Sequence, residues 1–267
     1  LSDLYACGAR PVSALAALTL PFARGSLLQR ELEQILAGAL HEFSQVECVL
    51  TGGHSMQGPE LQIGFAVNGR AMQASAGFMD KRGAEPGNVL ILTKPLGTGV
   101  LFAAHMQQLA DGRDISAALE MMLQSNAAAA GLALAQGATA CTDVTGFGLA
   151  GHLLEMLTDD QQATLHLGSL PQLPGVAEHL AAGVRSTMHQ ANAASALVSM
   201  DAGLLSGVSG AEVLFDPQTS GGLLIAVEAT AATTLLEALS EAGCEQAAVI
   251  GEISQRPAGA SVAVVIS

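Results

Sequence analysis

The first third of the chain mixes hydrophobic positions at helical and at strand-like spacing. Apolar side chains recur at helical spacing over residues 27–43, which predicts an amphipathic helix. Residues 46–50 and 61–67 are short apolar or alternating runs typical of strands, and Asn68-Gly69 after the second run is a turn signal. Residues 81–88 are charged and carry two glycines and a proline, which makes them the best candidate for a linker.

Beyond this segment, strands and helices interleave without strict alternation. The predicted strands cover residues 89–93, 138–144, 163–167, 223–227, 247–253 and 262–266, and the predicted helices cover residues 99–109, 115–135, 149–157 and 229–242. This order favours an α+β layered architecture rather than a doubly wound α/β sheet. The length of 267 residues is typical of two domains, which we place at residues 1–84 and 85–267.

Composition and charge exclude several classes of protein. Half of the residues are hydrophobic, so the bulk of the chain is not disordered. The chain has ten Lys and Arg and 24 Asp and Glu, which gives a net charge of −14. So few positive charges argue against binding to nucleic acid or to an anionic membrane. No apolar stretch reaches the roughly 20 residues that a membrane span needs. The four cysteines form no CxxC pair, and we expect four buried thiols in a cytoplasmic protein.

Residues 146–151 match the GxGxxG spacing of dinucleotide-binding loops, between a predicted strand and a predicted helix. Two features argue against that function. Asp143 at the strand end would repel a bare pyrophosphate, and the next predicted strand ends with His166 and no carboxylate.

The same segment has a second interpretation, in which Asp143 leaves a strand and glycines follow at a helix N-terminus. A carboxylate there can hold Mg²⁺, and a helix N-terminus favours phosphate. The alternative is an Asp helix cap beside a structural glycine turn. Spacing alone leaves both open.

Three other segments carry polar chemistry that an ordinary turn also explains. Residues 51–55 (TGGHS) and 216–222 (DPQTSGG) combine glycines with hydroxyl groups, and residues 94–99 (KPLGTG) form a strand-to-helix turn without P-loop spacing. We expect His152 and Glu155, on one helix face, to be solvated or capping groups.

Taken in order, these motifs resemble the selenophosphate synthetase family, also called selenide, water dikinase. The resemblance spans essentially the whole chain and rests on LSDLYACGARP at residues 1–11, TGGHS at 51–55, KPLGTG at 94–99, TDVTGFGLAGH at 142–152, LPGV at 173–176 and DPQTSGGLL at 216–224. Each piece alone is weak, but six in family order are specific.

The resemblance implies a two-domain α+β fold like that of aminoimidazole ribonucleotide synthetase, and a homodimer formed through the sheet of the N-terminal domain. It implies ATP contacts from Asp3, Gly53, His54 and Ser55, and Mg²⁺ ligands at Asp3 and Asp143. The implied reaction converts ATP, selenide and water to selenophosphate, phosphate and AMP. An acidic chain can hold ATP when divalent cations lie between carboxylates and phosphates.

The family's reactive Cys or selenocysteine lies in a glycine-rich segment that we expect upstream of Leu1, so this chain carries no expected catalytic nucleophile and Cys7 is not assigned that role. We therefore expect an incomplete N-terminal domain and weak or no turnover by this chain alone. Two alternatives are a nucleotide-binding dimerisation module without catalysis, and another ATP-dependent enzyme of the superfamily, such as a thiamine monophosphate kinase or a hydrogenase-maturation protein.

Overall fold

The computed structural model describes residues 1–73, 77–201 and 210–267, and the chain packs as two units. Unit 1 comprises Leu1 and Gly8–Gly77, and unit 2 comprises Ser2–Cys7 and Phe78–Ser267. The domain boundary expected between residues 84 and 85 stays a prediction.

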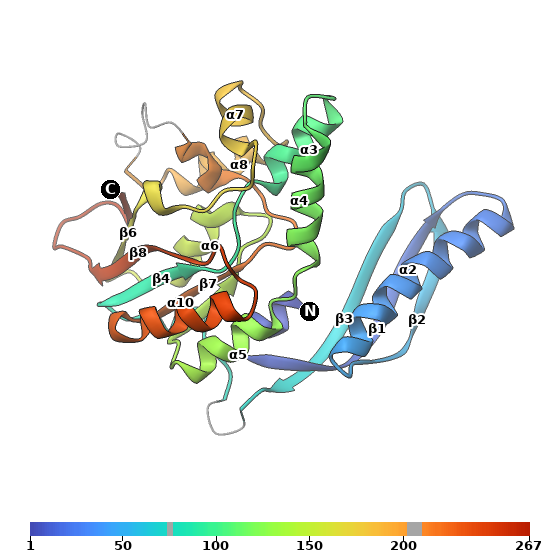
Figure 1. The fold of residues 1–267 in the computed structure, drawn as a ribbon, viewed down its shortest axis with the longest axis horizontal. Helices are drawn as coiled ribbons and strands as arrows, with labels where there is room; N and C mark the ends of the chain where they lie inside the picture. The colour runs from blue at the N-terminus through green and yellow to red at the C-terminus, as the bar shows by residue number, and fades with distance from the viewer. Residues whose placement is uncertain (74–76, 202–209) are drawn as a thin grey trace. The chain divides into compact units, whose positions relative to one another are not determined.

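Unit 1 is a three-stranded sheet with one helix on one face (Figure 1). Strand β1 (Ala9–Pro21) is central, parallel to β2 (Val49–Gly58) and antiparallel to β3 (Gln62–Ala71). Alternate β1 side chains are buried on the face that helix α2 (Gly25–Gln45) covers: Ala14, Ala16, Leu18 and Leu20. The helix predicted over residues 27–43 is confirmed, and its Phe43 ring packs edge-on against Phe65 of β3 with centroids 5.4 Å apart.

Two local predictions in unit 1 were wrong. Residues 51–55 do not leave the sheet, because β2 continues through them to Gly58, and Asn68-Gly69 lies inside β3 rather than in a turn. The long central strand β1 pairs with both segments along their length, and these ladder hydrogen bonds outweigh the local turn propensity of glycine and asparagine.

Unit 2 is built on a six-stranded sheet in the order β5-β7-β4-β8-β6-β9, in which only the β6–β9 pair is parallel. The strands are β4 (Asn88–Leu92), β5 (Ala140–Asp143), β6 (Gln161–Leu165), β7 (Leu223–Glu228), β8 (Ala248–Gln255) and β9 (Val264–Ile266). Successive residues of β4 and β7 are all or nearly all buried, because helices cover both faces of the sheet (Figure 1).

The longer helices of unit 2 include α3 (Thr98–Met106), α4 (Gly112–Leu123), α5 (Ala127–Ala135), α6 (Gly148–Met156), α8 (His189–Ala196) and α10 (Ala232–Glu241). Shorter helical segments are α1 (Ser2–Ala6), α7 (Val176–Ala181), η1 (Leu167–Ser169), η2 (Ala211–Phe215) and η3 (Ala229–Ala231). Among the described residues, no helix combines the length and apolar character that crossing a membrane would require.

The single helix predicted over residues 115–135 is wrong, because the chain forms two helices, α4 and α5. Gln124 is extended, with ψ 122°, and Asn126 is buried. The Asn126 side-chain amide donates to the Gly221 carbonyl and to the Ser2 hydroxyl, both at 2.9 Å. The break is a tertiary feature, since these acceptors come from distant parts of the chain.

A substitution at Gly53 would test the close parallel pairing of β1 and β2. A Cβ at this position would collide with the backbone oxygen of Ala16, so we expect Gly53→Ala to lower the free energy of unfolding by about 1–3 kcal/mol. Gly64→Ala is the matched control, because its Cβ would lie 3.7 Å from the Ala17 oxygen, an ordinary contact. Hydrogen exchange of residues 9–21, together with urea unfolding, measures the effect. Equal protection in both variants would contradict the close approach.

Candidate functional site

The glycine-rich motifs of unit 2 meet at one end of its sheet. Asp143, the last residue of β5, pairs with Leu223 at the start of β7. The Val144 N–H donates to the Gly222 carbonyl at 2.9 Å, and the Thr93 N–H donates to the Leu223 carbonyl at 3.0 Å. The segments 142–148 and 216–222, about 70 residues apart in sequence, are therefore neighbours at the ends of β5, β7 and β4.

Asp3 and Asp143 share one neighbourhood of unit 2. Helix α1, which carries Asp3, packs against β5, which carries Asp143. Both carboxylates raise the pKa of the Cys7 thiol, although partial desolvation of the thiol is the larger cause. Asp3 is exposed and Asp143 is half-buried. Within the described ranges, neither forms an ion pair with Lys, Arg or His, and no group of three or more His, Cys, Asp and Glu is arranged to hold a metal.

The cysteines differ from the expectation of four buried thiols. Cys48, Cys141 and Cys244 are buried, but Cys7 is exposed at the end of α1. The raised pKa of Cys7 keeps it largely in the thiol form near neutral pH, and the thiolate is the reactive species.

Asp143 does not cap helix α6, so the helix-cap interpretation is wrong. The N-cap position is Phe147, and no side chain accepts a capping hydrogen bond there. Gly148, the first helical residue, has φ +71°, and a Cβ on it would come within 2.8 Å of the Leu214 carbonyl. This glycine fits tight packing against the 214–216 segment, while the Asp143 carboxylate takes no part in capping.

The 216–222 loop is fixed by buried polar contacts with the start of α3. Asp216 is fully buried, and burial raises its pKa to about 6. The Gln218 side-chain oxygen accepts from the Gly97 N–H at 2.9 Å and from the Thr98 N–H at 3.3 Å. The loop thus supplies acceptors for N–H groups at the start of α3 that have no partner inside the helix.

Lys94, which follows β4, is a buried cation at the same end of the sheet. It is 2% exposed, and its ammonium donates to the carbonyls of Gln124 at 2.7 Å and Ser220 at 3.0 Å. Burial lowers its pKa to about 8. No carboxylate forms an ion pair with it in the part of the chain that the structure describes. Lys94 therefore ties the 216–222 loop to the α4–α5 junction.

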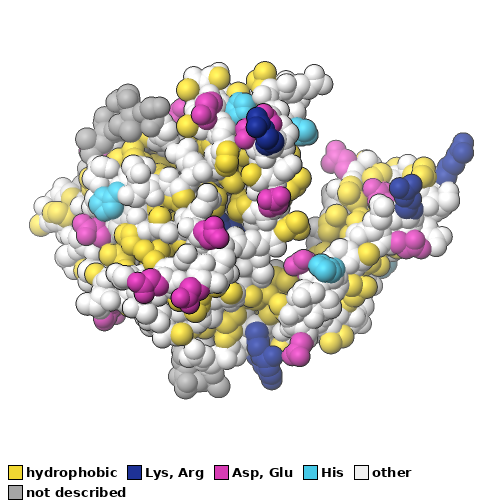
Figure 2. All heavy atoms as spheres, in the orientation of Figure 1, with side chains coloured by type: hydrophobic (Ala, Val, Ile, Leu, Met, Phe, Trp, Pro, Cys, Tyr) yellow, Lys and Arg dark blue, Asp and Glu magenta, His cyan; other side chains and the backbone are white. Residues whose placement is uncertain are grey.

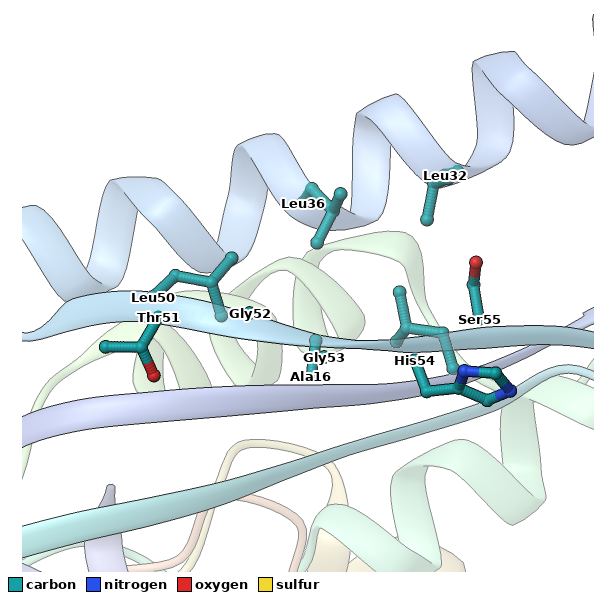
Figure 3. A pocket seen from close by; sticks show the side chains of 10 residues that line it. Ala16, Leu32, Leu36, Leu50, Thr51, Gly52, Gly53, His54 and Ser55 are labelled. Atoms are coloured by element: carbon teal, nitrogen blue, oxygen red, sulfur yellow. The ribbon is translucent and has the colours of Figure 1, made fainter.

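The other three predicted site residues lie in unit 1. Gly53, His54 and Ser55 line a groove of about 370 Å³ between β2 and α2 (Figure 3). Ser55 points toward α2, where Leu32 and Leu36 form the opposite wall, and His54 projects from the other face of the sheet. The structure thus brings Asp3 and Asp143 together in unit 2 and the three glycine-motif residues together in unit 1.

His152 contradicts the expectation of a solvated or capping side chain. It is 5% exposed, and its Nε2 lies 3.1 Å from the Thr145 hydroxyl. A signal was present in the sequence, because His152 falls three residues after Leu149 and four before Met156, on the apolar face of α6. Thr145 carried no such signal, since its partner lies on the following helix.

The family follows from the fold and from sequence comparison. Residues 1–71 match the N-terminal domain of AIR synthase related proteins, and residues 85–263 match the C-terminal domain of the same family. The chain is an AIR synthase related protein, which confirms the predicted fold class.

Similarity to curated relatives assigns the chain to a narrower family within this class. The selenide, water dikinase of Trichlorobacter lovleyi is 38% identical over 264 residues, 96% of this chain and 72% of that protein. The selenide, water dikinase of Salmonella typhi is 38% identical over 263 residues, 97% of this chain and 73% of that protein. The chain belongs to the selenide, water dikinase family.

Solved structures with other names share the fold. Hydrogenase maturation protein HypE in complex with ATP has a TM-score of 0.72 at 18% identity, covering 99% of this chain and 72% of that chain. Thiamine-monophosphate kinase from Stenotrophomonas maltophilia has a TM-score of 0.69 at 20% identity, covering 100% of this chain and 75% of that chain. At this identity the likeness concerns the fold alone.

Lys94 gives a pH-dependent prediction. Between pH 8 and the ordinary lysine pKa of 10.5, the unfolded chain holds a proton that folded Lys94 has released. The free energy of unfolding therefore rises with pH across this window. We expect wild type to gain up to about 3 kcal/mol relative to Lys94→Met between pH 8 and 10.5. Urea unfolding at several pH values measures the difference, with Lys81→Met as the control. Parallel profiles for wild type and Lys94→Met would contradict it.

Proposed function

We propose that this chain carries the nucleotide and metal chemistry of a selenide, water dikinase, in which ATP, selenide and water give selenophosphate, phosphate and AMP. The observation that carries the proposal is the neighbourhood of Asp3 and Asp143, two acids from separate family motifs, at one end of the unit 2 sheet. Family membership supports the substrates. We assign the family's Cys or selenocysteine nucleophile to no residue of this chain.

The proposed metal is Mg²⁺, held by Asp3 and Asp143. Mg²⁺ prefers oxygen ligands and is commonly bound through one or two carboxylates, with substrate phosphates and water completing its shell. Two carboxylates without a cationic partner in the described ranges fit that pattern, and a third protein carboxylate is not required. When bound, the ion would offset the negative charge of the phosphates.

The charge of the protein supports the same proposal. On the face shown in Figure 2, acidic side chains are spread over the surface and Lys and Arg lie at isolated positions. The net charge is −14, so few Lys and Arg side chains could neutralise a bound triphosphate. A divalent ion is the simpler way to neutralise the phosphates.

For the nucleotide we propose contacts from Gly53, His54 and Ser55 in addition to Asp3. Glycines leave backbone N–H groups accessible, and the imidazole and hydroxyl groups can donate or accept hydrogen bonds. All three residues line the groove of unit 1, with Ser55 directed into it and the His54 imidazole on the opposite face of the sheet. The free thiols among the described residues suit a reducing compartment, and we infer a cytoplasmic setting.

The product nucleotide separates this function from a second candidate. Solved neighbours named HypE and thiamine-monophosphate kinase have the same fold, so another ATP-dependent activity of the superfamily is the alternative. We expect the nucleotide that the protein forms from ATP in the presence of selenide to be AMP, released with phosphate, even at the low rate expected of this chain alone. Chromatography of the nucleotides and ³¹P NMR for selenophosphate measure both products. ADP as the final nucleotide, with selenide making no difference, would favour the alternative.

The metal site gives a binding prediction that does not depend on turnover. Asp143→Asn removes one charged oxygen ligand, and we expect Mg²⁺-dependent ATP affinity to fall at least about tenfold in a calorimetric titration. Asp159→Asn, at an exposed aspartate elsewhere in unit 2, is the control and should bind as wild type does. Unchanged affinity in Asp143→Asn would exclude Asp143 as a ligand.

A homodimer through the open face of the unit 1 sheet is also proposed. Leu15 of β1 is 46% exposed, and Val49 and Met56 of β2 are 60% and 53% exposed, all on the face away from α2. Exposed apolar side chains on a sheet face are typical of an interface. We expect Leu15→Asp to give a monomer by light scattering, whereas Leu123→Asp, at an exposed leucine of α4, should not. The same mass for Leu15→Asp and wild type would contradict this interface.

A further inference from the structure

Thr145, His152 and Glu155 form a chain of hydroxyl, imidazole and carboxylate groups that the proposed function does not use. The Thr145 Oγ1 lies 3.1 Å from His152 Nε2, and His152 Nδ1 lies 3.6 Å from a carboxylate oxygen of Glu155. Thr145 belongs to the loop after β5, and the other two residues lie one turn apart on α6. A nucleophile, a base and an orienting group in this order are the parts of an activated hydroxyl.

The surroundings set the protonation of the imidazole. His152 is 5% exposed, and its Nδ1 is buried without a hydrogen bond, with a carboxylate oxygen of Glu155 3.6 Å away. A carboxylate only accepts, which favours a proton on Nδ1 and leaves Nε2 as the acceptor for the Thr145 hydroxyl. Burial is the first cause of a lowered pKa at His152, which favours the neutral ring that can accept a proton.

Both ends of this chain of groups are accessible. Glu155 is half-buried and forms an ion pair with the partly exposed Lys81, so this end of the group reaches the surface. At the other end Thr145 is half-buried, and the next residue, Gly146, is exposed, with no heavy atom within 4 Å of a Cβ built on it. The backbone that follows the hydroxyl-bearing residue is therefore open on its Gly146 side.

We propose that Thr145 is a phosphoryl acceptor, with His152 as its base and Glu155 orienting the ring. The inference rests on the proposed function, because the donor is a nucleoside triphosphate bound near Asp143, two residues before Thr145. The Thr145 oxygen attacks the terminal phosphorus, and an oxygen–phosphorus bond forms. The bond from that phosphorus to the bridging oxygen breaks, ADP leaves with the electron pair, and His152 Nε2 takes the hydroxyl proton. The products are phosphothreonine, ADP and a protonated His152.

The fold favours the product as well as the step. Phosphothreonine at residue 145 would carry its charge just before the N-terminus of α6, where the helix dipole stabilises an anion. The Thr145 carbonyl accepts from the N–H groups of Gly148 at 3.0 Å and Gln218 at 2.9 Å, so the backbone that bears the hydroxyl is held from two sides.

The test combines labelling with exchange. The full chain is incubated with Mg²⁺ and γ-labelled ATP without selenide, and peptides are analysed by mass spectrometry for phosphate on Thr145. Transfer of label from ADP into ATP detects a phosphothreonine that is too short-lived to accumulate. We expect exchange in wild type and in Thr145→Ser, and a loss of at least about 100-fold in Thr145→Val and His152→Gln. Thr164→Val, which removes a hydroxyl from β6, is the control and should exchange as wild type does.

Calorimetry with Mg-ATP and thermal unfolding accompany each variant. If wild type binds no ATP, the proposed function fails and this inference fails with it. If wild type binds ATP but shows neither label nor exchange, the inference alone is overturned. Exchange that persists in Thr145→Val excludes the acceptor, and exchange that persists in His152→Gln excludes the base. Loss of exchange in either variant supports the proposal only where ATP affinity and thermal stability stay at the wild-type level.

Discussion

The close backbone approach at the end of the unit 2 sheet is the constraint on which the site depends. A Cβ on Gly221 would collide with the Val144 carbonyl, and one on Gly222 would come within 2.6 Å of the Lys94 backbone nitrogen. Only glycine lets the 216–222 loop run this close to the ends of β5 and β4. The ladder bond from Val144 to Gly222 then fixes where β5 ends, and with it where Asp143 stands. The carboxylate is thus placed by backbone packing rather than by contacts of its own.

The electrostatics of this region follow from the same packing. Asp216, the first residue of the loop, and Lys94 beside the loop are both buried, and burial moves their pKa values toward neutrality from opposite sides, to about 6 and about 8. Lys94 donates to two backbone carbonyls, and the Asp216 carboxylate accepts from the Gln218 amide, so these two groups do not form an ion pair with each other. Asp3 and Asp143 differ, because they are exposed or half-buried and lack cationic partners in the described ranges. Carboxylates in that state suit an incoming cation.

Sequence reasoning worked where the signal was local. The helix at residues 27–43, the strands at 89–93 and 223–227, and Asp143 at a strand end are all confirmed, because each depends on periodicity within a few residues. It failed where a distant partner decides. The long strand β1 draws residues 51–55 into the sheet, and distant acceptors for the Asn126 amide stabilise the break between α4 and α5. Turn and helix propensities are local and carry no information about such distant partners.

The sequence by itself determined the family, because six short motifs in a fixed order can be read from the sequence without any knowledge of the fold. Its net charge of −14 also indicated that a divalent ion would be needed to neutralise a bound triphosphate. Only the tertiary structure decided that Asp3 and Asp143, 140 residues apart, share a neighbourhood, that Cys7 is exposed, and that His152 is buried against Thr145. The physical reason is that charge and motif are properties of the chain, whereas burial and proximity arise from which segments pack together.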